Sequence, residues 1–154
     1  MKTKTIVLTL ALCFGAGAVC LAADPQLGTW KLNEDKSKFD SGAVKNSTVA
    51  YEAAGDKIKV TVDGTTADGK AVHHEWTGKY DGKDYPVTGD ANQDVRSYKK
   101  VGDRTLEFVA RKDGKVTVSG RVVVAADGKS RTVTTSGTNA EGKKFKSTAT
   151  YDKQ

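Results

Sequence analysis

Short runs of alternating apolar and polar residues fill most of this chain. Ile58, Val60 and Val62 alternate with lysine and threonine, and Leu106 and Phe108 alternate with threonine and glutamate. Successive side chains of a β-strand point to opposite faces of the sheet, so each run predicts a strand with one buried and one solvated face. No segment keeps the apolar spacing of a long amphipathic helix. The pattern therefore predicts an all-β protein.

Glycine beside aspartate separates these runs, as at Asp63-Gly64, Asp113-Gly114 and Asp127-Gly128. Such pairs supply the positive φ angles of tight hairpin turns, so the strands should follow one another as an antiparallel meander. We expect a short helical turn or a loop over 34–45, and irregular chain or one short strand over 82–92. The expected strands are 28–33, 46–53, 57–63, 70–80, 94–101, 104–112, 115–125, 129–138 and 143–151.

A meander of this length has to protect its two edge strands, and closure into a barrel removes the edges altogether. We therefore predict an antiparallel up-and-down meander, closed or nearly closed into an 8–10-stranded barrel. A two-sheet β-sandwich is the alternative.

The chain also matches itself at an offset of 73 residues, as when Val60-Thr61 meets Val133-Thr134 and Gly69-Lys70 meets Gly142-Lys143. Two interpretations stay open. Either 46–80 and 119–153 are duplicated three-strand units, or two meanders converged on the same turn residues.

The first residues have the order of a secretory signal peptide. Lys2 and Lys4 precede an uncharged apolar stretch over 6–21, and small residues follow it. The stretch is shorter than the roughly 20 apolar residues that a bilayer-spanning helix needs. We predict a signal peptide at 1–23 and one mature domain at 24–154, exported to the periplasm or the extracellular space, without a membrane span.

Both cysteines, Cys13 and Cys20, lie inside the predicted signal. The mature domain would then have no disulfide, no thiol nucleophile and no cysteine-based zinc site. Cys20 as the lipid-bearing residue of a lipoprotein is the alternative, although the residues before it fit that motif poorly.

Charge and motifs argue against several functions. The formal net charge is +6, but the lysines are scattered among acidic residues and form no basic stripe, so we expect no nucleic-acid partner. His73-His74-Glu75 lies on a predicted strand, where His73 and His74 face opposite sides and cannot share one metal. No nucleophile elbow, P-loop or dinucleotide fingerprint is present. We expect no metal, no cofactor and no catalysis.

The inward face of the predicted barrel is mostly apolar with a few polar groups, the composition of a small-molecule pocket. It predicts a binding protein for a small apolar or amphipathic ligand. Small barrels also fill their interiors with side chains, so an envelope structural or protein-interaction module with a filled core is the alternative. The candidate ligand-binding residues are His74, Trp76, Tyr80, Phe108, Phe145, Ser147 and Tyr151.

The mature domain opens with Gly-Thr-Trp-Lys-Leu at 28–32. This resembles the Gly-x-Trp of the lipocalins' first strand and, more weakly, the start of intracellular fatty-acid-binding proteins. Most of the mature chain is similar to small exported bacterial proteins described as lipocalin-like. The resemblance implies structural roles for Gly28 and Trp30, with Trp30 closing one barrel end. It also implies that Arg121 or Arg131 packs across this tryptophan through a cation–π contact.

The chain departs from fatty-acid-binding proteins in two places. Tyr151 matches the tyrosine of their terminal Arg-x-Tyr, but Ala149 occupies the arginine position. The segment 34–45 is too short for the paired helices that cover those barrels. We therefore expect no such carboxylate clamp, and a barrel that is open-mouthed or tightly filled.

Overall fold

The protein is a closed antiparallel barrel of ten strands in the computed structural model, which describes residues 23–139 and 141–154. The predicted all-β meander is confirmed, and the sandwich alternative is wrong. The predicted signal peptide and both cysteines lie outside the described residues, apart from Ala23. The strands are β1 (Gly28–Phe39), β2 (Lys45–Ala54), β3 (Lys57–Thr65), β4 (Ala71–Gly78), β5 (Tyr85–Thr88), β6 (Val95–Gly102), β7 (Thr105–Lys112), β8 (Lys115–Val124), β9 (Ser130–Thr138) and β10 (Lys144–Lys153).

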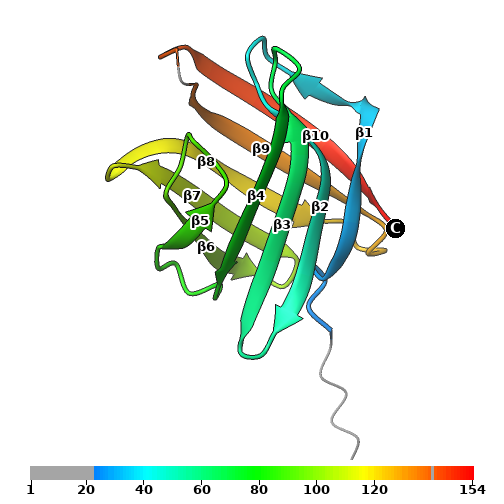
Figure 1. Cartoon of the computed structure of the whole chain (residues 1–154). Coiled ribbons are helices and arrows are strands. Elements are labelled where there is room, and N and C mark those ends of the chain that lie inside the picture. Colours follow the sequence, from blue (N-terminus) through cyan, green and yellow to red (C-terminus); the bar gives the residue numbers. More distant parts are fainter. Residues whose placement is uncertain (1–22, 140) are drawn as a thin grey trace, which may run out of the picture.

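The barrel closes because β1 pairs with strands from both ends of the chain. Trp30 on β1 lies opposite Val49 of β2 on one side and Lys153 of β10 on the other. The first strand (blue) and the last strand (red) consequently lie side by side in Figure 1, and all ten strands curl around one interior. Every strand has two neighbours, so no edge is left for pairing with another chain.

Alternate residues face this interior as the sequence pattern predicts. Val60, Val62, Leu106 and Phe108 are all buried in one hydrophobic cluster. Val116 is the exception. Within the predicted strand 115–125 it shares the alternation of Val118, Val122 and Val124, which predicts that it faces inward, but it is 57% exposed. The register between β7 and β8 shifts where Ala110 pairs with Val118 but Arg111 pairs with Val116, and this bulge at Thr117 turns Val116 outward.

The segment 34–45 is not the helical turn or loop that we expected over its whole length, because β1 continues to Phe39. Its register with β10 shifts between Asn33 and Lys38. The Ser37 hydroxyl bridges the irregular stretch, since it donates to the Asn33 carbonyl oxygen (2.6 Å) and accepts from the Thr150 amide (2.9 Å). A side chain thus replaces the missing ladder bonds, and only the short connection after Phe39 is a loop.

Asp63-Gly64 is not a turn, which is a second correction. Both residues lie in β3, and the connection to β4 follows Thr65. Gly64 instead permits a close approach to β2, where a Cβ atom would come within 2.3 Å of the Lys45 carbonyl oxygen. The register of β2 against β3 shifts at this point, between Asn46 and Thr48.

The suspected repeat has a partial structural counterpart. In the hairpin of β3 and β4, Val60 pairs with Trp76, and at the offset of 73 residues Val133 pairs with Ala149 in the hairpin of β9 and β10. The preceding strands do not keep this register. Tyr51 faces Val60, whereas Val122 rather than Val124 faces Val133. The two segments therefore have the same strand pairing in one hairpin, but the pairing of the strand before that hairpin differs by two residues.

No helix with the length and apolar character needed to cross a bilayer occurs within residues 23–139 and 141–154.

Candidate functional site

The barrel encloses a cavity of about 170 Å³ near one of its ends. Residues from nine of the ten strands, all except β5, and from four connecting loops border it. The lining combines apolar residues such as Val62, Phe108 and Val122 with polar residues that include His74 and Arg96. A mixed lining of this kind suits a small molecule with an apolar body and one polar group.

Five of the seven predicted ligand-binding residues line this cavity. They are His74 from β4, Phe108 from β7, and Phe145, Ser147 and Tyr151 from β10. Alternation along β10 explains why three of them occur on one strand, because residues two apart share a face.

Trp76 and Tyr80 do not line the cavity, contrary to our expectation. The Trp76 indole is buried and donates to the Arg96 carbonyl oxygen at 2.8 Å. The ring of Tyr98 packs edge-on against both Trp76 (4.8 Å between centroids) and Tyr80 (6.1 Å), and it borders the cavity in their place. Trp76 therefore belongs to the packed core, and the partly buried Tyr80 packs against that core.

The end of the barrel beyond this cavity is closed by Trp30. Its side chain is fully buried, and its indole N–H donates to the Gln26 carbonyl oxygen at 2.8 Å. Gly28 has φ +117, and a Cβ atom there would lie 2.8 Å from Cε of Lys153. The Lys153 ammonium group lies 5.2 Å from the Trp30 ring. The Gly-x-Trp motif thus builds a plug in which the glycine makes room for the lysine.

Arg131 is the arginine that packs across Trp30, with its guanidinium 4.8 Å from the ring centroid. Arg121 does not take this role, which corrects the other candidate. It lies on the outer face of β8 and forms an ion pair with Glu107. The two positions have opposite orientations because Arg121 lies opposite Thr134 on the outer face, whereas Arg131 lies opposite the inward-facing Val124 and Tyr151.

Three aromatic rings surround the Arg131 guanidinium. Besides Trp30, the rings of Tyr51 (4.8 Å) and Tyr151 (5.1 Å) lie within cation–π distance. Arg131 is only 2% exposed, and it forms no salt bridge among the described residues. Its Nε and Nη1 atoms have no hydrogen-bond partner within that part of the chain. Burial raises the pKa of Tyr151 to about 12, so its ring stays neutral beside the cation.

A second buried arginine, Arg96, belongs to a polar cluster near the loop after β5. Its Nε donates to Gln93 Oε1 (2.9 Å), its Nη1 donates to the Tyr98 hydroxyl (3.2 Å), and its Nη2 lies 3.3 Å from His74 Nε2. The Gln93 amide in turn donates to Asp90. The donors of Arg96 are therefore largely occupied by the protein itself.

His74 connects this cluster to the cavity. Burial, reinforced by the Arg96 guanidinium, lowers the pKa of His74 to about 4, although Asp90 Oδ2 lies 3.6 Å from its Nδ1. The imidazole is therefore neutral at pH 7 and leaves Asp90 and the two arginines as the charges that border the cavity.

Sequence reasoning missed Arg96, Tyr98, Asp90 and Gln93. Arg96 and Tyr98 are two apart on β6, which was a usable signal for a shared face. A charged residue on a strand usually indicates the solvated face, so the face that carries Arg96 and Tyr98 was not predicted to point inward. Asp90 and Gln93 lie in the loop between β5 and β6, where no periodicity applies.

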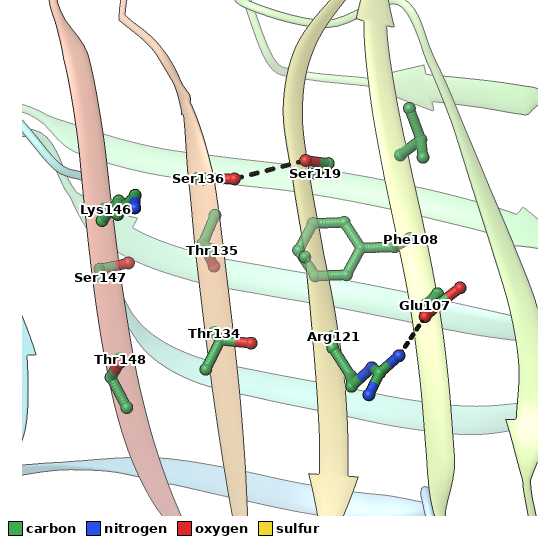
Figure 2. A pocket seen from close by; sticks show the side chains of 12 residues that line it. Glu107, Phe108, Ser119, Arg121, Thr134, Thr135, Ser136, Lys146, Ser147 and Thr148 are labelled. Atoms are coloured by element: carbon green, nitrogen blue, oxygen red, sulfur yellow. Dashed lines mark hydrogen bonds and ion pairs between the residues drawn. The ribbon is translucent and has the colours of Figure 1, made fainter.

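A wider hollow of about 570 Å³ lies on the outer wall across β7 to β10 (Figure 2). It is shallow and open to solvent. Four of the labelled polar residues are paired there, since Ser119 lies 3.4 Å from Ser136 and Arg121 pairs with Glu107. We do not assign a site to this hollow, because its groups are exposed and satisfied whereas those of the smaller interior cavity are buried.

Within the described residues, no three acidic, histidine or cysteine side chains are grouped so that they could hold a metal ion.

No protein-family model matches the chain, and no curated protein matches it. Among solved structures, it is similar to a redesigned beta barrel, mFAP1, bound to DFHBI, with 17% identity over 86% of this chain and 98% of that chain at a TM-score of 0.45. It is also similar to EF1p2_mFAP2b bound to DFHBI, with 14% identity over 86% of this chain and 97% of that chain at a TM-score of 0.48.

Proposed function

We propose that this protein is an exported, non-catalytic binding protein that holds a small amphipathic molecule inside its barrel. The observation that carries the proposal is the interior cavity of about 170 Å³, whose lining combines apolar and aromatic side chains with a nearly equal number of polar ones. An interior that was completely filled would favour the structural-module alternative, and this interior keeps an unfilled space of about 170 Å³.

The volume of the cavity limits the size of the ligand. An apolar cavity of about 150 Å³ holds benzene, and pockets for drug-sized molecules measure about 300–1,000 Å³. The cavity here therefore suits a ligand body of roughly benzene's size. A long acyl chain would have to extend out through the loops.

Binding of benzamide, measured by ligand-observed NMR and calorimetry, tests the proposal. Ala149 is buried on the cavity wall, and Ala149→Leu adds three carbon atoms to the interior. We expect this variant to lose at least about tenfold in affinity. Thr148 is the matched control because it directly precedes Ala149 on β10 and faces outward. The Thr148→Leu variant should therefore bind benzamide as the wild-type protein does. Absence of any binding by the wild-type protein would refute the proposal.

Export is a separate part of the proposal and rests on the order of residues over 1–23. Mass spectrometry of the protein recovered from its host should show a mature chain that starts near Asp24. A mature chain that begins with a lipid-modified Cys20 would replace the soluble protein with a membrane-anchored one.

A further inference from the structure

The ring of strands is closed, but the pairing of β1 with β2 is incomplete. β1 has 12 residues and β2 has 10, yet β1 pairs with β2 only over Gly28–Lys31. Beyond this point β2 continues to pair with β3 as far as Lys45, and β1 continues beside β10. The wall therefore has a seam between the described residues 32–39 of β1 and 45–47 of β2, which form no ladder with each other.

The interior cavity reaches this seam. Phe39 of β1, Val44 of the connecting loop and Asn46 of β2 all border the cavity. The Asn46 Oδ1 atom is buried and has no hydrogen-bond partner within the described part of the chain. β5 also pairs with its neighbours over a short length, but none of its residues borders the cavity. The incomplete part of the wall that adjoins the cavity is therefore the seam between β1 and β2.

One lysine spans the seam from β2 to β1. Lys45 Nζ forms an ion pair with Glu34 Oε2 at 2.7 Å, and it lies 5.6 Å from the centroid of the Phe39 ring. The Lys45 and Glu34 side chains are 46% and 65% exposed, so water competes for both contacts and each is weak. These side-chain contacts take the place of ladder bonds, and a segment held in this way opens locally at low cost.

The loop between β5 and β6, which also borders the cavity, is held more firmly. The Asp94 amide donates to the Arg111 carbonyl oxygen, and Asp94 Oδ2 accepts from the Asp113 amide, both at 2.9 Å. Gln93 Oε1 accepts from the buried Arg96 Nε, also at 2.9 Å. Displacing this loop breaks several hydrogen bonds, one of them buried, whereas opening the seam breaks only the exposed contacts of Lys45.

We propose that ligands enter and leave the cavity through the seam between β1 and β2, and that Lys45 is the latch that holds the seam shut. This inference rests on the proposed binding function and adds the route by which the ligand reaches the cavity. The seam is closed in both the free and the bound protein, so the latch stabilises both states equally. It therefore changes the rates of association and release by the same factor and leaves the dissociation constant unchanged.

Bridging the seam tests this route, with benzamide as the probe. Glu34→Cys and Lys45→Cys are combined in a protein whose Cys13 and Cys20 are replaced by serine, and the two new thiols are joined by dibromobimane. We expect bridging to slow the association and the release of benzamide, measured from NMR line shapes, at least about tenfold with an unchanged dissociation constant. The same variant before bridging should exchange benzamide at least as fast as the wild-type protein.

Lys59→Cys combined with Glu75→Cys is the matched control. This ion pair also measures 2.7 Å and is partly exposed, but it lies across the continuous ladder of β3 and β4. Bridging it should leave both rates as they are. Lys45→Met tests the latch in the opposite direction, because it removes the ion pair without blocking the seam, and both rates should rise about two- to fivefold. Lys59→Met should not change them.

The outcomes separate the entry route from the binding function. Exchange of benzamide at an unchanged rate after the seam is bridged would overturn the entry route and leave the binding function intact. A Lys45→Met variant whose dissociation constant changes while its association rate stays the same would show that Lys45 stabilises the bound ligand instead of latching the seam, and it would also overturn the inference. If benzamide does not bind the wild-type protein, the proposed function fails and the entry route fails with it.

Discussion

The two ends of this barrel contain the same kinds of strand but use their interiors differently. Around Trp30 the space is solid, since Trp30, Leu106 and Val124 are at most 2% exposed. Toward the other end, Val72, Val118 and Phe145 are only partly buried and border the cavity together with His74 and Asp90. A single sheet can thus supply a packed plug at one end and a chamber with unfilled space at the other. The difference comes from side-chain size and polarity rather than from topology.

The largest expected effect concerns the plug. Trp30→Ala removes a fully buried indole together with one ring of the Arg131 cage, and should lower the free energy of unfolding by about 3–5 kcal/mol. Denaturant unfolding measures this loss. Val116→Ala, at an exposed apolar residue, should change stability by less than about 0.5 kcal/mol. A small cost at Trp30 would show that the closed end is not the more stable part of the barrel.

The chamber should respond to pH in a way that the plug does not. Because the folded-state pKa of His74, about 4, is below the unfolded value of about 6.5, the unfolded chain binds the proton more readily. The contribution of neutral His74 is complete above about pH 6.5 and is lost as pH falls toward 4, by up to about 3 kcal/mol. His74→Gln should flatten this part of the stability profile. His73→Gln, at an exposed residue, should remove little of it, and an unchanged profile in His74→Gln would contradict the assignment.

The barrel wall at Gly120 of β8 should tolerate added side-chain volume poorly. A Cβ atom there would lie 2.3 Å from the Thr134 carbonyl oxygen and 2.7 Å from the Phe108 ring. Gly120→Ala should therefore cost about 1–3 kcal/mol by overpacking, measured by thermal unfolding. Gly102→Ala is the control, because its nearest contact would be an ordinary 3.5 Å to Thr105. Equal melting temperatures for the two variants would mean that the wall yields easily.

The smallest expected effect is at the outer arginine. Arg121→Met breaks an ion pair with Glu107 between two exposed side chains, and such pairs contribute about 0–1 kcal/mol. Chemical denaturation should detect almost no change. A loss as large as that of Trp30→Ala would show that the outer face of β7 and β8 carries stability that the burial pattern does not reveal.

Much of the site was predictable where alternation was unbroken. Phe145, Ser147, Ala149 and Tyr151 form one face in sequence, and all four border the cavity. The prediction for Val116 was wrong because a bulge changes which residues of a strand face inward, and no residue type in this strand indicates the bulge.

The sequence alone determined the all-β fold, because the two-residue period of a strand and the φ angles of its turns are local properties of the chain. The resemblance to lipocalins left two candidates, Arg121 and Arg131, for the arginine that stacks on the tryptophan. Only the tertiary structure decided that Arg131 faces inward, that Arg96 joins it, and that about 170 Å³ stays unfilled. These outcomes depend on which side chains from distant strands meet across the interior, and that meeting is fixed only when the sheet closes.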